Sequence, residues 1–191
     1  MQRQIVLASS SKYRKELLSL LGLKFKVAKS NFVEDMTLPL KPVKLAEFLA
    51  LGKAKEVAQK YPNAIVIGAD TLAEYKGKVY GKPQTAKNAK KYLKLFSGKT
   101  HLAITGLAIL DTNTGKTWSK ALVTKVKFRK IHNDEIDSYV KTKEPLDKAG
   151  GYTIRKRGAM FVESLEGGYT TVVGLPLCEL SVALRKFGVK I

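Results

Sequence analysis

The segment Ile65–Thr71 constrains the fold and the chemistry of this chain more than any other stretch. It is a short apolar run rich in β-branched residues and follows a Pro-Asn pair, so the pattern predicts a buried strand. That strand ends by presenting the carboxylate of Asp70 and the hydroxyl of Thr71. Ligands of open α/β sheets bind beyond the carboxyl ends of the strands. This end is therefore a candidate site, although a lone aspartate there more commonly caps a turn.

Composition narrows the class of protein. The chain has 191 residues, 45% apolar and 27% charged, which is ordinary for a globular domain. No apolar run approaches the roughly 18 residues that span a bilayer. The first expected strand begins too early to leave room for a signal peptide. The single cysteine, Cys178, fits a reducing compartment and is expected to be a small buried hydrophobe. These features predict a cytoplasmic protein with no membrane partner.

The charge is strongly positive. There are 35 lysines and arginines against 16 aspartates and glutamates, a formal net charge of +19. Such a surface attracts polyanions at long range. However, the lysines are spread along the whole chain, and the aromatic residues show no stacking pattern of the kind that single-strand binders use. Specific nucleic-acid binding is therefore possible but not favoured.

The N-terminal segment combines a strand, a serine-rich turn and a helix. Residues 5–8 form the strand, three serines including Ser9 and Ser11 form the turn, and the helix continues to Gly22. A helix N-terminus favours an anion, and Arg14 can bind phosphate oxygens bidentately. A serine cap with a solvated basic face is the commoner explanation of such a pattern, so this segment alone does not establish a phosphate site.

The remaining elements alternate between helices and strands, without an internal repeat or a linker. The spacing predicts an α/β fold with an elongated mixed sheet flanked by helices. By spacing alone, Lys53 is a solvated charge within its helix, whereas Gly81 and Pro83 place Lys82 on a defined corner. His101 is expected to make a structural hydrogen bond. The expected elements are a strand at 25–28, a helix at about 43–61, a hairpin at 74–80, a helix from Thr85 to about Phe96, strands at about 101–111 and 117–130, a helix from about 133, a loop at 144–152, a strand at 168–176 and a C-terminal helix opened by Pro176.

Polar residues from several segments could meet at the end of the central strand. Two carboxylates can hold a hard divalent ion such as Mg²⁺, which usually keeps several waters and shares substrate phosphates. Basic side chains neutralise charge on phosphate oxygens. A carboxylate beside a metal-bound water can act as its base. The chain contains no GxxxxGK[ST], GxGxxG, HExxH or GxSxG motif and no paired CxxC. The candidate residues are Ser9, Ser11, Arg14, Glu34, Lys53, Asp70, Thr71 and Lys82.

These residues belong to a longer series of motifs in which the chain resembles the Maf-like family, nucleoside triphosphate pyrophosphatases once called septum-formation inhibitors. The resemblance covers nearly the whole length in order. The motifs are Leu7-Ala8-Ser9-Ser10-Ser11 with Arg14, Glu34, Lys53-Ala54, Gly68-Ala69-Asp70-Thr71, Gly81-Lys82-Pro83, Ser97-Gly98 with His101, Thr105-Gly106, Glu144 to Gly150, and Val172-Val173-Gly174-Leu175-Pro176.

The resemblance implies a single domain, residues 1–191, with two lobes, a cleft between them and a fold shared with the inosine triphosphate pyrophosphatases. It implies hydrolysis between the α and β phosphates of a nucleotide, including modified or noncanonical ones, with Mg²⁺ or Mn²⁺. Asp70 would accept the proton of water and bind the metal with Glu34. Catalytic Lys82 and the residues Lys53, Arg14, Ser9 and Ser11 would hold the triphosphate. Family members are commonly homodimers.

The sequence departs from the family where the family selects its base. The thymidine/uridine type has two consecutive arginines after the serine turn, whereas Tyr13 here resembles the aromatic residue of the 7-methyl-GTP type. Arg155 stands where these types have glutamine and glutamate respectively. Thr71 is the usual residue, and Tyr152 with the segment 172–174 favours the thymidine/uridine type. An aromatic can stack on any base and an arginine can bind a carbonyl-rich edge, so the preferred base stays open.

Two other functions fit parts of the sequence. A nonenzymatic nucleic-acid-binding or division-regulating protein would explain the charge of +19. It would not explain why two carboxylates occur among phosphate-binding cations. A phosphatase of smaller phosphoesters would use similar residues but release orthophosphate.

Overall fold

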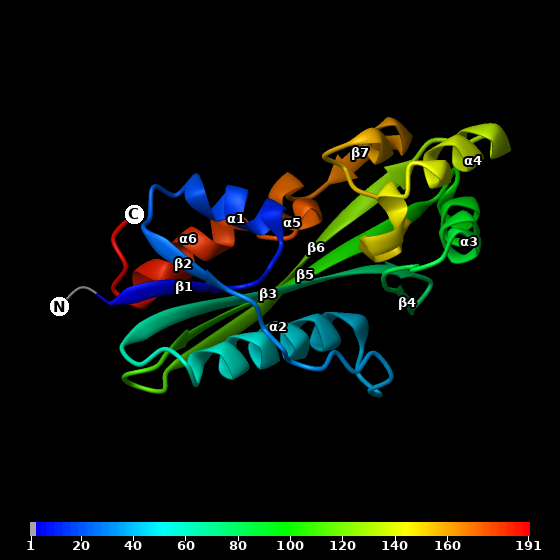
Figure 1. The fold of residues 1–191 in the computed structure, drawn as a ribbon. Helices are drawn as coiled ribbons and strands as arrows, with labels where there is room; N and C mark the ends of the chain where they lie inside the picture. Colours follow the sequence, from blue (N-terminus) through cyan, green and yellow to red (C-terminus); the bar gives the residue numbers. More distant parts are fainter. Residues whose placement is uncertain (1–2) are drawn as a thin grey trace. The chain divides into compact units, whose positions relative to one another are not determined.

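The computed structural model describes residues 3–191 (Figure 1). Seven strands of this part of the chain form one mixed sheet in the order β2-β1-β3-β5-β6-β7, with β4 paired to β3. The strands are β1 (Gln4–Ala8), β2 (Phe25–Ala28), β3 (Ala64–Tyr75), β4 (Lys78–Tyr80), β5 (Thr100–Asp111), β6 (Thr117–Phe128) and β7 (Val162–Glu166). The helices are α1 (Lys12–Ser19), α2 (Pro42–Ala58), α3 (Ala86–Phe96), α4 (Asn133–Lys141), α5 (Tyr169–Val173) and α6 (Leu177–Lys186). Short 3₁₀ helices are η1 (Glu144–Asp147), η2 (Ala149–Gly151) and η3 (Arg157–Phe161). The predicted α/β class with a mixed sheet is confirmed.

The chain divides into two compact units. The first comprises the chain up to Asp70 together with residues 105–122 and 174–191, and the second comprises residues 71–104 and 123–173. The three longest strands, β3, β5 and β6, each contribute residues to both units. None of the helices described between residues 3 and 191 is both long and apolar enough to cross a membrane.

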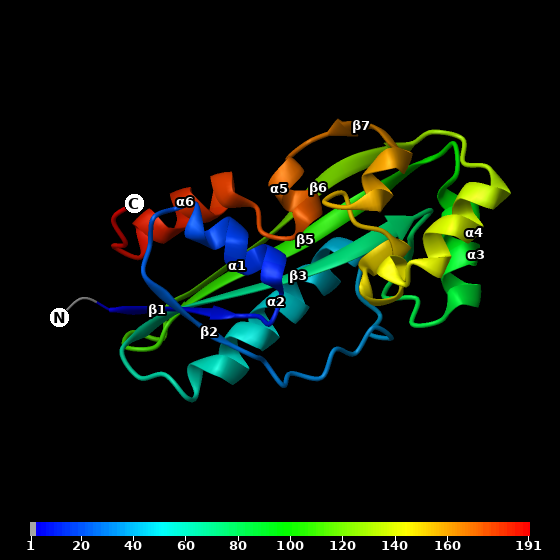
Figure 2. The same cartoon turned by 45° about the horizontal axis from the view of Figure 1, so that its top comes forward.

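The first unit is a layered α/β structure. β1 pairs in parallel with β2 and with β3, and Leu7 lies opposite Ile67 in the β1–β3 register. Helix α2 covers one face of these strands, while α1 and α6 cover the other (Figures 1 and 2). Small residues bring α2 very close to the sheet, because a Cβ added at Gly68 would meet the carbonyl oxygen of Ala50. The core of this layer consists of Val6, Ala8, Ala50, Ala54, Val57, Ala64, Val66 and Ala108.

The second unit has an aromatic core that encloses a histidine. The His101 ring stacks on Phe96 with centroids 4.3 Å apart, and its Nε2 lies 2.8 Å from the hydroxyl of Tyr152. The predicted structural hydrogen bond is therefore confirmed. Burial lowers the pKa of His101 to about 4, so the ring is neutral near neutral pH. Phe128, Tyr139 and Phe161 are the other large aromatic side chains that are fully buried in this core.

The predicted hairpin after the central strand is also confirmed. β3 pairs antiparallel with β4, and the two turn residues Lys76 and Gly77 have φ values of 51° and 78°. Two consecutive positive φ values are typical of the tight turns that join twisted strands. The Glu74 carboxylate accepts a hydrogen bond from the Gly77 backbone N–H.

The strand predicted at 168–176 is wrong. Residues Tyr169–Val173 form helix α5, and the last strand, β7, lies just before them and pairs with β6. Gly167, with a φ of 128°, ends the strand, and the hydroxyl of Thr124 donates to the Gly168 carbonyl oxygen at 3.1 Å. Tertiary contacts therefore override the strand preference of the β-branched run.

The predicted burial of Cys178 is wrong as well, because this residue is exposed on α6. The buried residues of that helix are Leu180, Ala183 and Leu184. Their spacing follows one helical face. Cys178 precedes Leu180 by two positions, about 200° around the helix axis, and therefore points away from that face.

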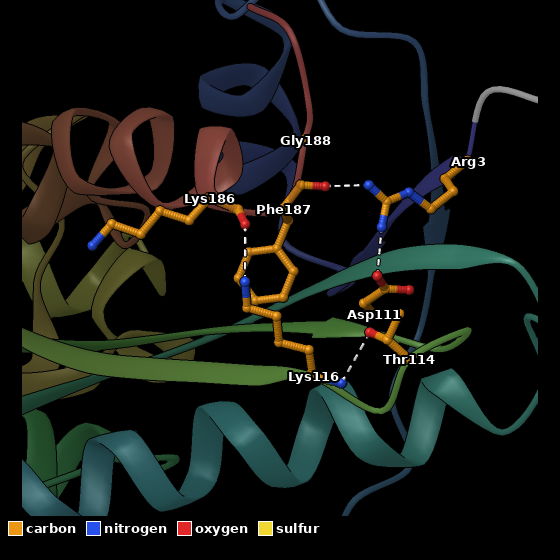
Figure 3. A pocket seen from close by; sticks show the side chains of 7 residues that line it. All are labelled: Arg3, Asp111, Thr114, Lys116, Lys186, Phe187 and Gly188. Carbon is orange, nitrogen blue, oxygen red and sulfur yellow. Dashed lines mark hydrogen bonds and ion pairs between the residues drawn. The ribbon is translucent and has the colours of Figure 1, made fainter.

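Two basic side chains close the C-terminal end of α6 (Figure 3). The Arg3 guanidinium contacts both the Asp111 carboxylate and the Phe187 carbonyl oxygen. Lys116 Nζ donates to the carbonyl oxygen of Lys186 at 3.0 Å and lies 4.9 Å from the centroid of the Phe187 ring. The last carbonyl groups of a helix lack intrahelical partners and attract cations. The surrounding pocket, with a volume of about 300 Å³, is therefore explained by helix capping and contains none of the predicted site residues.

Candidate functional site

The serine turn after β1 forms the first wall of the site. The Ser11 hydroxyl accepts a hydrogen bond from the Arg14 backbone N–H at 3.4 Å and caps α1. The buried Ser9 hydroxyl accepts from the Ser11 backbone N–H at 3.1 Å and from Arg14 Nη1 at 3.4 Å. The predicted serine cap is confirmed, and the turn also orients the arginine.

Arg14 is held in place from two sides. Its Nε donates to the Gly174 carbonyl oxygen at 2.8 Å, which is a contact that no sequence pattern indicated. Burial lowers the pKa of Arg14, while the negative charges of Asp70 and Glu34 oppose that shift. An arginine stays protonated in proteins, so its charge faces these two carboxylates from a fixed position.

Lys53 links the two predicted carboxylates. Its Nζ lies 2.7 Å from Glu34 Oε1 and also contacts Asp70 Oδ1. Only 11% of the lysine side chain is exposed, compared with 7% for Asp70 and 39% for Glu34. The expectation of a solvated charge from spacing alone is therefore wrong. The close packing of α2 on the sheet at Gly68 brings Lys53 beside Asp70. The predicted end of the strand at Asp70 and Thr71 is wrong, because the pairing with β4 carries β3 on to Tyr75.

Asp70 has the electrostatics of a proton acceptor. Burial raises its pKa, and the charges of Lys53 and Arg14 oppose the shift without cancelling it, while Glu34 adds to it. A general base is most effective when its pKa approaches the working pH. A buried carboxylate with a raised pKa in a cluster of charges is also characteristic of functional sites.

The donor set fits a divalent cation. Glu34 and Asp70 both contact one nitrogen atom, Lys53 Nζ, so their oxygens are close enough to share a cation. Carboxylate oxygens are suitable ligands for Mg²⁺ and Mn²⁺, and Mg²⁺ commonly takes one or two carboxylates plus phosphates and water. Among residues 3–191, no three His, Cys, Asp or Glu side chains form a metal-binding group. The remaining ligands would therefore have to come from water and substrate.

The second unit carries Lys82, whose exposed position is fixed by its neighbours. The Gly81 carbonyl oxygen accepts from the Gly150 N–H at 3.1 Å, and the Gln84 N–H donates to the Leu146 carbonyl oxygen at 2.9 Å. The corner around Lys82 is thus attached to the segment 144–151 on both sides. This confirms the predicted defined corner.

The positions expected to select the base have different surroundings. Tyr13 is half-buried on α1, directly before Arg14. Arg155 has an exposed side chain, and its backbone N–H donates to the Thr153 hydroxyl at 3.3 Å. Thr71 is half-buried on β3.

The predicted site residues are divided between the two units. Those of the first unit lie together, and the others belong to the second unit. The first group contains Ser9, Ser11, Arg14, Glu34, Lys53 and Asp70, with Tyr13 on the same helix as Arg14. The second contains Thr71, Lys82 and Arg155.

One structural residue was not singled out from the sequence. Glu144 Oε1 accepts from the Tyr139 hydroxyl at 2.8 Å and from the Gly158 N–H at 3.1 Å. This carboxylate joins α4, η1 and η3 and so holds the segment to which the Lys82 corner is attached. The only sequence signal was the Glu-Pro pair that opens the motif at 144–150.

The chain is similar to known proteins over nearly its whole length. The family described as Maf-like protein matches residues 4–187. The dTTP/UTP pyrophosphatase of Methanococcoides burtonii is 45% identical over 190 residues, which cover 99% of this chain and 97% of the relative. The dTTP/UTP pyrophosphatase of Alkaliphilus oremlandii is 45% identical and covers 96% of this chain and 95% of the relative. A solved nucleoside-triphosphatase / dITP/XTP pyrophosphatase from Mycobacterium abscessus is 14% identical, with a TM-score of 0.45, and covers 95% of this chain and 93% of that one.

Proposed function

Because this chain belongs to the Maf-like protein family, we propose that it is a nucleoside triphosphate pyrophosphatase. It hydrolyses the bond between the α and β phosphates and releases the nucleoside monophosphate and pyrophosphate. The observation that carries this proposal is the cluster around Lys53, in which two carboxylates contact one ammonium group and also interact with the charge of the half-buried Arg14. The names of relatives 45% identical to the chain support the same reaction.

Each residue of the cluster has a role in this reaction. Asp70 accepts the proton of the attacking water while the new P–O bond forms and the bridge between the α and β phosphates breaks. Its raised pKa makes it a better base than an exposed aspartate. Arg14 and Lys53 bind phosphate oxygens and offset the charge that develops on them. The resemblance implies that Lys82, which belongs to the second unit, is a further cation for the phosphates.

Glu34 and Asp70 would hold a divalent ion, Mg²⁺ or Mn²⁺. When bound, such an ion neutralises phosphate charge and lowers the pKa of a coordinated water. Lys53 keeps both carboxylates close together, and burial of Asp70 excludes bulk water from one of them. The ion is part of the proposal because the oxygen donors fit it.

For the base, dTTP and UTP are the first substrates to test, since the relatives are named for them. Tyr13 and Arg155 differ from the residues that the resemblance associates with that type. Modified or noncanonical bases are therefore included in the proposed range of substrates.

The proposal is tested by product analysis with a panel of nucleoside triphosphates, including methylated and deaminated bases, with Mg²⁺ or Mn²⁺. We expect pyrophosphate and the monophosphate in equal amounts. Asp70→Asn should lower kcat by about 10²- to 10⁴-fold, the usual contribution of a general base. Asp35→Asn is the matched control, because Asp35 is an exposed carboxylate next to Glu34 whose partner is Thr37.

Three outcomes would contradict the proposal. Orthophosphate as the first product would indicate a phosphatase of smaller phosphoesters. Full activity of Asp70→Asn would exclude the proposed base. Absence of turnover in the folded wild-type protein with metal present, together with tight polynucleotide binding that survives Asp70→Ala and Glu34→Ala, would favour the nonenzymatic alternative.

A further inference from the structure

Lys53 contacts both of the carboxylates that would hold the divalent ion of the proposed function. One ammonium group lies between Glu34 and Asp70, 2.7 Å from an oxygen of the first and in contact with an oxygen of the second. A cation shared by two carboxylates is the arrangement that a divalent ion would also adopt. Lys53 therefore occupies the space that the ion of the proposed function would need.

The charges of this cluster balance without an ion. Two cations, Lys53 and Arg14, face two carboxylates, Glu34 and Asp70, and each carboxylate influences the arginine. Without a cation between them, the carboxylates would repel each other, and burial would further disfavour the charged form of Asp70. Lys53 thus keeps both carboxylates in place, but in doing so it competes with the divalent ion for their oxygen atoms.

We propose that Lys53 is an exchangeable stand-in for the divalent ion: it bridges Glu34 and Asp70 until the ion binds, and then turns toward the phosphates of the nucleotide. This inference rests on the proposed function. A lysine is suited to such an exchange because it carries a compact charge on a flexible stem of four carbons. Arg14 is not, because its guanidinium is anchored to the Gly174 carbonyl oxygen at 2.8 Å.

The proposal predicts that removing the ammonium strengthens binding of the ion in the absence of nucleotide. Mn²⁺ is titrated into the full-length protein at pH 8, and the electron paramagnetic resonance signal of unbound Mn²⁺ reports the Kd. The proteins compared are the wild type, Lys53→Met and Lys55→Met. Lys55 is exposed on the same helix, so its substitution removes the same charge without removing the bridge. We expect Lys53→Met to bind Mn²⁺ about tenfold more tightly than Lys55→Met, a difference of about 1.4 kcal/mol.

The outcomes separate this inference from the proposed function. Equal affinities of Lys53→Met and Lys55→Met, with clear binding by the wild type, would overturn the stand-in role and leave the metal site intact. Weaker binding by Lys53→Met would also overturn it, because the lysine would then support the ion rather than compete with it. Absence of binding in all three proteins would overturn both the metal site and the inference.

A second measurement follows the lysine itself in the wild-type protein and does not depend on the Mn²⁺ affinity of a variant. In wild-type protein with ¹³C-labelled lysine, the Lys53 side-chain signal is assigned by its loss in Lys53→Gln. Mg²⁺ added without nucleotide should shift this signal and leave that of Lys55 unchanged. A Lys53 signal that does not respond at saturating Mg²⁺ would contradict the exchange.

Discussion

At the scale of single residues, burial of the Asp70 carboxylate serves the proposed proton transfer but lowers the stability of the fold. Burial raises its pKa, so between the pKa of the unfolded chain and the higher pKa of the folded protein the folded state binds more protons. The free energy of unfolding therefore decreases as the pH rises through this interval. We expect Asp70→Asn to unfold at a higher temperature than the wild type at pH 8, and this difference to shrink as the pH falls through the folded pKa. Thermal denaturation followed by circular dichroism across pH 4–8 measures it.

Asp35→Asn is the control for this experiment. Hydrogen bonds from Thr37 lower the pKa of Asp35, so its neutral variant should not gain stability at pH 8. A variant Asp70→Asn that is less stable than the wild type at pH 8 would show that its ion pair with Lys53 outweighs the cost of burial.

Tyr13 and Arg155 are the residues at which the choice of base can be tested. The thymidine/uridine type of the Maf-like family, as the resemblance implies, has arginine and glutamine at these two positions. We expect the double variant Tyr13→Arg, Arg155→Gln to raise kcat/KM for UTP relative to 7-methyl-GTP, mainly through KM, because neither side chain belongs to the proposed proton-transfer group. Steady-state kinetics with both nucleotides checks the ratio. An unchanged ratio would mean that other residues select the base.

At the level of elements, the packing of α2 against β3 decides whether the site assembles. A Cβ at Gly68 would meet the backbone oxygen of Ala50, which cannot rotate away as a side chain can. We expect Gly68→Ala to destabilise the protein by about 1–3 kcal/mol, the usual cost of overpacking, and to lower activity by displacing Lys53. Urea denaturation measures the stability. Gly81→Ala is the control, because nothing lies within 4 Å of a Cβ added there.

The contact between β5 and the segment after η2 depends on a neutral histidine. His101 has a pKa of about 4 in the fold, so the unfolded chain binds more protons between that value and the ordinary 6.5. Stability should therefore decrease as the pH falls from 6.5 to 4, by about 3 kcal/mol from this group. His101→Gln should show a shallower pH dependence of its free energy of unfolding. His132→Gln, at the exposed N-terminus of α4, should behave as the wild type does; identical slopes for all three proteins would contradict this assignment.

For the whole molecule, the net charge of +19 predicts attraction to polyanions that is independent of the site. We expect binding to heparin or mixed-sequence DNA to weaken steeply and log-linearly with salt, as counterion release requires, and to be the same for Asp70→Asn as for the wild type. Fluorescence anisotropy at several salt concentrations measures this. Binding that tolerates salt or depends on base sequence would instead indicate specific recognition. The homodimer implied by the resemblance stays a prediction.

Much of the local structure follows from residues close together in the chain. The serine cap at Ser11, the turn at Lys76-Gly77 and the strand leading to Asp70 each depend on backbone preferences and periodicity within a few residues. Such signals are local because capping bonds and turn dihedrals involve neighbouring residues. The order of motifs along the chain was sufficient to indicate the family, and the family match over residues 4–187 confirms it.

Other properties depended on contacts between distant segments. Spacing predicted that Lys53 is a surface charge, and an apolar run predicted that Cys178 is a core residue. The tertiary structure reversed both, because burial depends on which face of a helix meets the sheet. The β-branched run at 169–173 is a helix, and the segment just before it, β7, is the one that pairs with β6. Local patterns thus specified most of the elements and the chemical groups, but not the helix at 169–173. Packing specified which groups share one cation, since that depends on how closely α2 approaches Gly68, a distance that no periodicity encodes.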